Sequence, residues 1–201
     1  MTEASPTLEA RAREEAEYLE QREFGFWLYL MSDAIIFALL FATYGVMVHG
    51  TAGGPTGKDV FDITHTFLET MALLCSSIAF GVAWLAARAG EKSKVLIWLL
   101  ITFALGLSFI ALEISEFLGM IASGADPGRS GFLSAFFTLV GTHGLHVSFG
   151  LVFILIMTAQ IALRGLNAHA MSRLFRLGLF WHFLDIVWIG IFSVVYLPGI
   201  L

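Results

Sequence analysis

The sequence predicts an all-α integral membrane protein in which five transmembrane helices form a bundle. The 201 residues are 58% hydrophobic and only 13% charged, which is about half the charged fraction of an ordinary soluble domain. The apolar residues also fall into five blocks, and each block reaches the roughly 20 residues that a helix needs to cross a bilayer. Cys75 is the only cysteine, which excludes an intramolecular disulfide and any metal site built from several cysteines.

The chain opens with an acidic tail over residues 1–23. The first 24 residues contain seven glutamates and three arginines, and Ser5 followed by Pro6 is typical of a helix start. We expect a short polar helix or a solvated segment here, on the cytoplasmic side. Because the tail lacks the basic start and apolar core of a secretory signal, the first span is expected to direct insertion. The negative charge of the tail disfavours nucleic acid and anionic lipid as its partners.

Residues 24–201 make up the predicted transmembrane domain. The five spans are expected at about residues 24–48, 64–87, 95–118, 131–163 and 174–198. The fourth span is longer than a bilayer requires, so we expect it to tilt or to project beyond the membrane. Five spans do not divide into two equal halves, which argues against the repeat architecture of many transporters.

The distribution of lysine and arginine predicts the orientation of the chain. Nine of the eleven basic residues lie in the N-terminal tail or in the connections that follow the second and fourth spans, and only Lys58 and Arg129 lie on the opposite side. Short cytoplasmic segments carry the excess of basic residues in membrane proteins. We therefore predict a cytoplasmic N-terminus and a periplasmic C-terminus.

Eight ionisable side chains lie inside the predicted spans, where polar groups are costly to bury and commonly serve a function. They are Asp33, Glu69, Glu113, Glu116, His143, His146, His182 and Asp185. The last six form three pairs with a spacing of three residues, so each pair shares one face of its helix.

Three interpretations of this set compete. The first is a metal or haem site, although a haem takes axial ligands from both sides of its ring, so His143 and His146 on one helix cannot both bind the same haem. The second is a proton route through the membrane. The third, which the sequence favours for most of the set, is hydrogen bonding between helices, with Asp33 and His182 at matched depth as a candidate pair. Asp33 is also suited to hold or exchange a proton, because burial disfavours its charged form.

Trp181 and Trp188 flank His182 and Asp185 within eight residues of the last span. Two tryptophans beside two ionisable groups are unusual on a surface that faces lipid tails. We expect this surface to contact a partner subunit, another helix or lipid headgroups.

Four motifs resemble subunit III of the haem–copper oxidases, over about residues 24–199. They are FGFWLYLMSD at 24–33, DPGRSGFLSAFF at 126–137, GTHGLHV at 141–147 and WHFLDIVW at 181–188. The five spans and the TAGGPTGK loop at 51–58 are similar to the quinol-oxidase branch of that family, of the cytochrome bo type.

The resemblance implies a complex of the bacterial inner membrane that oxidises ubiquinol, reduces oxygen to water and pumps protons. It implies that the haems and copper belong to subunit I, and that this subunit has no catalytic residue, metal or redox cofactor of its own. It further implies direct contact with subunit I, association with subunits II and IV, a cleft that holds phospholipid, and support of assembly and proton uptake.

The resemblance also bears on single residues. Asp33 occupies the position of a buried glutamate that reacts with a carboxyl reagent in the cytochrome c oxidase branch, and Glu116 matches a glutamate of the family. His143 and His146 match the family motif, in which they have no assigned ligand role.

Two other functions remain open on the residues alone. A small membrane anchor that binds haem b would need histidines on two spans at matched depth, and His143 or His146 together with His182 comes nearest to this. A free-standing transporter of protons or small solutes would need its buried polar groups to line a continuous path.

Overall fold

The computed structural model describes residues 6–200, with side chains from residue 21 onward. Every regular element in that part of the chain is a helix, and the five long helices are apolar enough to cross a membrane. The elements are α1 (Pro6–Met47), α2 (Gly57–Val60), α3 (Ile63–Arg88), α4 (Lys92–Ala122), α5 (Gly131–Arg164), α6 (Ala168–Ile191), the π-helical segment η1 (Phe192–Tyr196) and α7 (Leu197–Ile200). The predicted all-helical fold with five candidate spans is thereby confirmed, whereas the direction of the chain across the membrane stays a prediction.

The first helix is longer than the sequence suggested. The polar segment and the first span were expected as separate pieces, but α1 runs from Pro6 to Met47 without a break. Glutamate, alanine, arginine and leucine dominate residues 7–23, and these are strong helix formers. No proline follows Pro6 within the helix, so nothing stops the first turns from continuing into the span. The side chains of residues 1–20, which carry most of the predicted acidic tail, lie outside the described residues.

Side-chain caps fix where three of the long helices begin. Asp62 accepts a hydrogen bond from the backbone of Thr64 at the start of α3, Ser130 caps α5 and Asn167 caps α6. Each cap satisfies a backbone N–H group that has no partner within the helix. In the tight turn between α3 and α4, Gly90 has a φ of +75°, a conformation that glycine adopts without strain.

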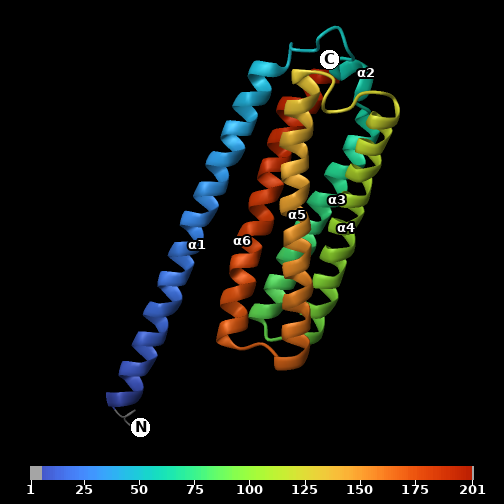
Figure 1. Cartoon of the computed structure of the whole chain (residues 1–201). Helices are drawn as coiled ribbons and strands as arrows, with labels where there is room; N and C mark the ends of the chain where they lie inside the picture. Colours follow the sequence, from blue (N-terminus) through green and yellow to red (C-terminus); the bar gives the residue numbers. More distant parts are fainter. Residues whose placement is uncertain (1–5, 201) are drawn as a thin grey trace.

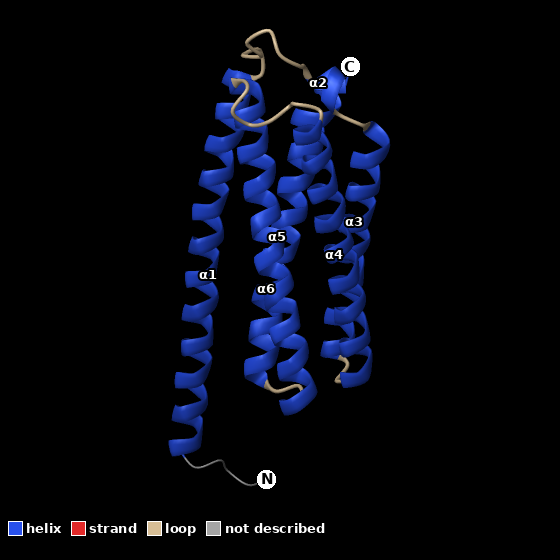
Figure 2. Ribbon diagram, turned by 45° about the vertical axis from the view of Figure 1, so that its right-hand side comes forward, coloured by secondary structure: helices blue, strands red, loops and turns tan. Residues whose placement is uncertain are grey.

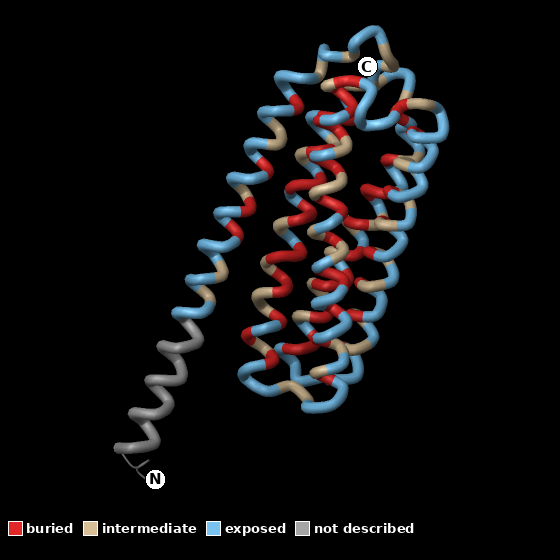
Figure 3. Tube along the Cα trace, in the orientation of Figure 1, coloured by how far each residue is buried: buried red, intermediate tan, exposed pale blue. Residues whose placement is uncertain are grey.

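Helices α3 to α6 form the compact part of the molecule (Figures 1 and 2). Helices α3 and α4 pair along their lengths, α5 packs between α4 and α6, and α1 contacts only α5 and α6 extensively. Figure 3 shows buried residues concentrated inside this four-helix part, whereas most of the described length of α1 is exposed. In a membrane protein such an apolar exposed surface is suited to lipid or to other subunits.

Glycines let the helices approach one another around two large rings. Gly106 on α4 and Gly150 on α5 both lie against the indole of Trp181, while Gly178 on α6 lies against Phe80 of α3. Close backbone approach through small residues is the usual way in which membrane helices gain packing contacts. This packing fixes the rotation of α6, and with it the positions of the polar residues that α6 carries.

Candidate functional site

The larger of two cavities is lined by residues of α1, α5 and α6, toward the end of the bundle opposite α2; Figure 1 shows how these three helices are arranged. It has a volume of about 640 Å³, and three arginines line it: Arg22, Arg173 and Arg176. We call it the arginine cleft. Its walls are apolar and consist mainly of Phe26, Phe149, Phe153, Ile156, Leu177 and Phe180.

The arginine cleft combines hydrogen-bond donors with an apolar interior. Arg173 donates to the Gln160 side chain at 2.8 Å, and Arg176 donates to the Ser172 hydroxyl at 2.7 Å, which in turn donates to Glu23. A guanidinium carries five N–H donors, so these bonds leave further donors on Arg173 and Arg176. Such a cleft fits an amphiphile that has an anionic headgroup and hydrocarbon tails.

His146 lies in the wall of this cleft and faces the buried Asp33. The His146 Nε2 and Asp33 Oδ2 atoms are 3.8 Å apart, and the His146 Nδ1 atom is 2.7 Å from the Thr142 carbonyl oxygen. Because a carbonyl oxygen only accepts, Nδ1 carries the hydrogen, and Nε2 then faces Asp33 as an acceptor unless one of the two groups takes up a further proton. The separation of 3.8 Å is within the range of an ion pair but too long for a direct hydrogen bond.

The predicted pairing of Asp33 with His182 is wrong. His182 Nδ1 lies 2.6 Å from the Ser77 hydroxyl of α3 and 3.6 Å from Asp185 Oδ2 on its own helix. The prediction assumed that two groups at the same depth would face each other. The rotation of α6 instead turns His182 toward α3, while α1, which carries Asp33, lies on the other side. Asp185 is buried, and neither of its carboxyl oxygens has a hydrogen-bond partner within the described residues.

His143 has surroundings quite different from those of His146, although the two share a helix. It is completely buried among the rings of Phe37, Phe109 and Trp188. Its Nε2 donates to the Leu184 carbonyl at 3.2 Å, and its Nδ1 has no partner within the described residues. His143 thus ties α5 to α6, while His146 faces the cleft.

The two tryptophans contact another helix of the same chain, which is one of the predicted alternatives. Trp181 is 1% exposed and Trp188 is fully buried. Trp181 Nε1 donates to Ser76 at 3.1 Å, and Trp188 Nε1 donates to Thr70 at 3.0 Å. Both indole N–H groups point to hydroxyl groups of α3 within the same chain, so the two tryptophans are structural residues of the bundle interior.

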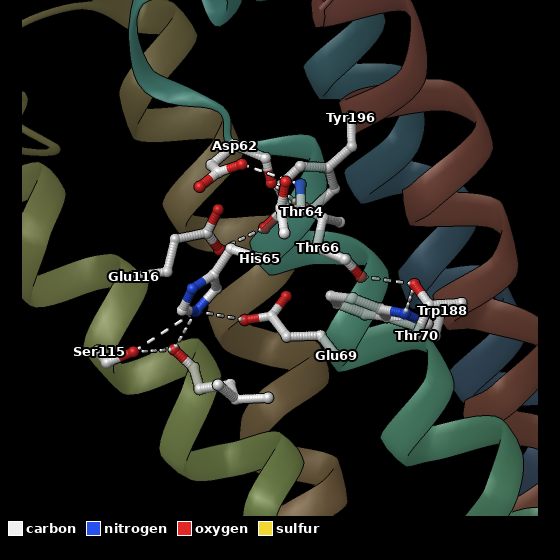
Figure 4. Close-up of polar contacts among 11 residues, drawn as sticks. Asp62, Thr64, His65, Thr66, Glu69, Thr70, Ser115, Glu116, Trp188 and Tyr196 are labelled. Atoms are coloured by element: carbon white, nitrogen blue, oxygen red, sulfur yellow. Dashed lines mark hydrogen bonds and ion pairs between the residues drawn. The ribbon is translucent and has the colours of Figure 1, made fainter.

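At the α2 end, the structure brings together three predicted residues from α3 and α4: Glu69, Glu113 and Glu116. Figure 4 shows two of them, Glu69 and Glu116. Glu116 accepts a hydrogen bond of 2.7 Å from Tyr196, which the π-helical segment η1 carries. His65 Nε2 lies 3.5 Å from Glu69 Oε1 and 3.1 Å from a backbone carbonyl of α4. We call these three carboxyl groups and His65 the glutamate cluster.

A second cavity opens beside this cluster. It has a volume of about 230 Å³, and its wall includes His65, Ser115, Glu116, Asp59 and Asp62. We call it the acidic cavity. At its rim the pKa of the exposed Asp59 is lowered, because its carboxylate accepts hydrogen bonds from the backbone and the hydroxyl of Thr56.

Sequence reasoning missed His65, Tyr196 and the three arginines as site residues. His65 stands four residues before Glu69, so the two share a helix face, and that spacing could have identified it. The arginines were used only to orient the chain, since nothing in the sequence brings Arg22 next to Arg176. Within residues 21–200, no group of three or more His, Cys, Asp or Glu side chains is arranged to hold a metal ion.

Comparison with known proteins gives a consistent result. The family described as cytochrome c oxidase subunit III matches residues 14–200 of this chain. The chain is 57% identical over 178 residues to the cytochrome bo(3) ubiquinol oxidase subunit 3 of Pseudomonas aeruginosa, covering 89% of this chain and 85% of that protein.

Two relatives from Bacillus extend the comparison. The quinol oxidase subunit 3 of Bacillus spizizenii is 42% identical over 88% of this chain and 86% of its own length. The cytochrome c oxidase subunit 3 of Bacillus sp. PS3 is 43% identical over 87% of this chain and 84% of its own length. Relatives that are 42–43% identical to this chain are therefore named both for quinol and for cytochrome c.

Proposed function

Because the chain belongs to the cytochrome c oxidase subunit III family of the haem–copper oxidases, we propose that it is subunit III of a ubiquinol oxidase that pumps protons. The observation that carries the proposal is the 57% identity, over 89% of the chain, to a relative named for ubiquinol. The complex is an oxidoreductase, and in this family subunit III is not itself catalytic. It is a multi-pass membrane protein, and we place it in the bacterial inner membrane with its N-terminus in the cytoplasm.

In this proposal the haems and copper reside in subunit I, which this chain contacts directly, and subunits II and IV complete the complex. The chain supports assembly of the complex and proton uptake by subunit I. The exposed apolar surface of α1 offers one area for contacts with other subunits or with lipid. Near the arginine cleft, the buried Asp33 beside His146 is best placed to hold a proton.

We further propose that the arginine cleft binds a phospholipid. Two requirements of such a ligand are met there, namely cationic donors for the phosphate from Arg22, Arg173 and Arg176, and apolar walls for the acyl chains. A bound lipid would fill the space between α1 and the rest of the bundle. It would thereby stabilise the position of α1, which few other contacts within the chain secure.

The function is tested by purifying the tagged chain from its native membrane in mild detergent. We expect larger partner subunits to copurify, with a haem signal in the reduced-minus-oxidised spectrum and with copper detected by elemental analysis. After the partners are stripped, the chain alone should be colourless. A haem spectrum that stays with the isolated chain would instead support the haem b anchor, and a chain that purifies without partners and transports protons in vesicles would support the transporter.

A control experiment tests the electron donor separately from the composition of the complex. The purified complex should oxidise ubiquinol and fail to oxidise reduced cytochrome c. Oxidation of cytochrome c instead would keep the family and overturn the ubiquinol assignment.

A further inference from the structure

The glutamate cluster contains more acidic groups than its surroundings can keep charged. Glu69 is fully buried, Glu113 is 3% exposed, and Glu116 is partly buried. Removing a carboxylate from water is costly unless a cation or several donors compensate it. The basic group that contacts Glu69 is His65, and none of the residues that line the acidic cavity is lysine or arginine.

Hydrogen bonding in the cluster is also incomplete. Neither carboxyl oxygen of Glu69 has a hydrogen-bond partner within the described residues, and the same is true of Oε1 in both Glu113 and Glu116. Native proteins rarely leave buried polar atoms without partners. A protonated carboxyl group supplies a donor that a carboxylate lacks, so protons on the cluster would remove both the excess charge and part of the missing hydrogen bonding.

The buried carboxyl group of Glu69 also points toward the acidic cavity, which is the route to water. Figure 4 shows the Glu69 carboxyl group pointing toward His65, whose ring lines the acidic cavity. The Ser115 hydroxyl lies 3.4 Å from His65 Nε2, and Glu116 contributes to the same wall. A polar cavity of about 230 Å³ has room for several water molecules, each of which occupies about 30 Å³ in the liquid.

We infer that Glu69, Glu113 and Glu116, together with His65, form a proton-binding site that exchanges protons with water through the acidic cavity. Each step transfers one proton between cavity water and a carboxyl or imidazole group, and it needs no other reactant. This inference does not depend on the identity of the electron donor or of the partner subunits.

The other ionisable groups around the cluster set its charge. The N-cap residue of α3 is Asp62, η1 contributes Tyr196 as a donor to Glu116, and α2 contributes Asp59 at the rim. From α5, the Gly144 backbone lies directly against the Glu113 carboxyl group, one residue from His143. All of these except His143 are acidic or neutral donors, so they add no positive charge that would hold three carboxylates ionised.

The test is infrared spectroscopy of the intact complex purified through a tag on this chain. Protonated carboxyl groups give a C=O stretching band that carboxylates lack, and the band shifts in D₂O when the proton exchanges. We expect this band to shift in D₂O and to weaken as the pH is raised. Glu69→Gln, Glu113→Gln and Glu116→Gln should each remove part of the band, whereas Glu91→Gln, on the exposed start of α4, should leave it unchanged.

A second variant tests the route and does not alter the cluster. Gly119 lines the acidic cavity, and a Cβ atom added there would have no other atom within 4 Å. Gly119→Leu should therefore narrow the inlet and slow the D₂O shift of the band. Gly81→Leu, at an equally open site on α3, should not. The inference is overturned if none of the three glutamine variants reduces the band, or if exchange in Gly119→Leu is as fast as in the unmodified chain.

Discussion

The two ends of this bundle contain cavities of opposite character. The arginine cleft is large, has mainly apolar walls and carries three cationic side chains, whereas the acidic cavity is small and is surrounded by carboxyl groups. The first lies where α1 stands against α5 and α6, and the second lies in the interface of α3 and α4. A loosely packed helix leaves space for an amphiphile, while a closely paired interface leaves space only for water and protons.

The two cavities also differ in whether their charged side chains can reach water. Arginine reaches water or a headgroup from an apolar position because its long side chain can extend to the interface. Glutamate on a paired helix has no such freedom, so Glu69 and Glu113 stay buried and their protonation must adjust. One end of the bundle can therefore keep its charges, while the other must neutralise them.

The largest effect is expected at the arginine cleft. Replacing Arg22, Arg173 and Arg176 by glutamine removes three cationic groups, each worth about 1 kcal/mol toward an anionic headgroup. This corresponds to about a hundredfold weaker retention of phospholipid for the triple variant. Mass spectrometry of the lipid that copurifies with the complex measures it, with Arg88→Gln on a different connection as the control.

If the triple variant retained as much phospholipid as the control, the cleft would not select its occupant by charge. The contrast between the two cavities would then reduce to a difference in size.

A medium effect is expected from glycine substitutions that compare the packing of the two regions. In Gly150→Ala the new methyl group would lie 2.8 Å from the Trp181 ring, which Ser76 holds by a hydrogen bond. Overpacking against a fixed ring costs about 1–3 kcal/mol. In Gly144→Ala the methyl group would press on the end of the Glu113 side chain, which can move, so the cost should be smaller.

Thermal unfolding of the complex in detergent orders these variants. Gly141→Ala is the matched control on the same helix, because its methyl group would make an ordinary contact of 3.7 Å with Phe117. A larger loss for Gly144→Ala than for Gly150→Ala would show that the glutamate cluster is the more rigid region.

The smallest effect is expected from removing the hydroxyl partners of the two tryptophans. Thr70→Val leaves Trp188 without its acceptor on the side of the glutamate cluster, and Ser76→Ala does the same for Trp181 nearer the arginine cleft. Hydrogen bonds between membrane helices contribute about 0.6 kcal/mol on average, so each variant should lower the unfolding midpoint slightly. The two bonds are alike in length and burial. If the two variants lowered the unfolding midpoint by different amounts, one end of α6 would be held more firmly than the other.

Hydrophobic patterning was sufficient to predict the all-helical fold and the order of its five long apolar helices. It also identified Glu69, Glu113 and Asp33 as interior residues, since a carboxyl group in the middle of a span has few places to go except inward. The partners of these groups could not be predicted in the same way. Whether Asp33 meets His146 or His182 depends on the rotation of α6, which is fixed by the packing of Trp181 between two glycines that are far away in the sequence.

The arginine cleft illustrates a second limit. Arg22 lies in the first long helix and Arg176 in the last, and only the position of α1 against α6 brings them to one opening. Trp181 and Trp188 illustrate a related limit, because the sequence left a partner subunit, another helix and lipid headgroups as alternatives for their contacts. Periodicity shows that two aromatic residues share a side of a helix, but it does not show whether that side faces the same chain or a neighbour.

The π-helical segment Phe192–Tyr196 has a consequence for how the chain tolerates insertions and deletions. A wide turn of this kind holds one residue more than an α-helical turn, so it is equivalent to a single-residue insertion into the last helix. Deleting one residue there would restore the ordinary turn and keep everything beyond it on nearly the same face. If all of its residues instead wound as an α-helix, everything beyond the turn would be rotated by about 100°, because an α-helix has 3.6 residues per turn. Tyr196 would then lose its hydrogen bond to Glu116. The length of this turn therefore sets the register in which the end of the chain contacts the glutamate cluster.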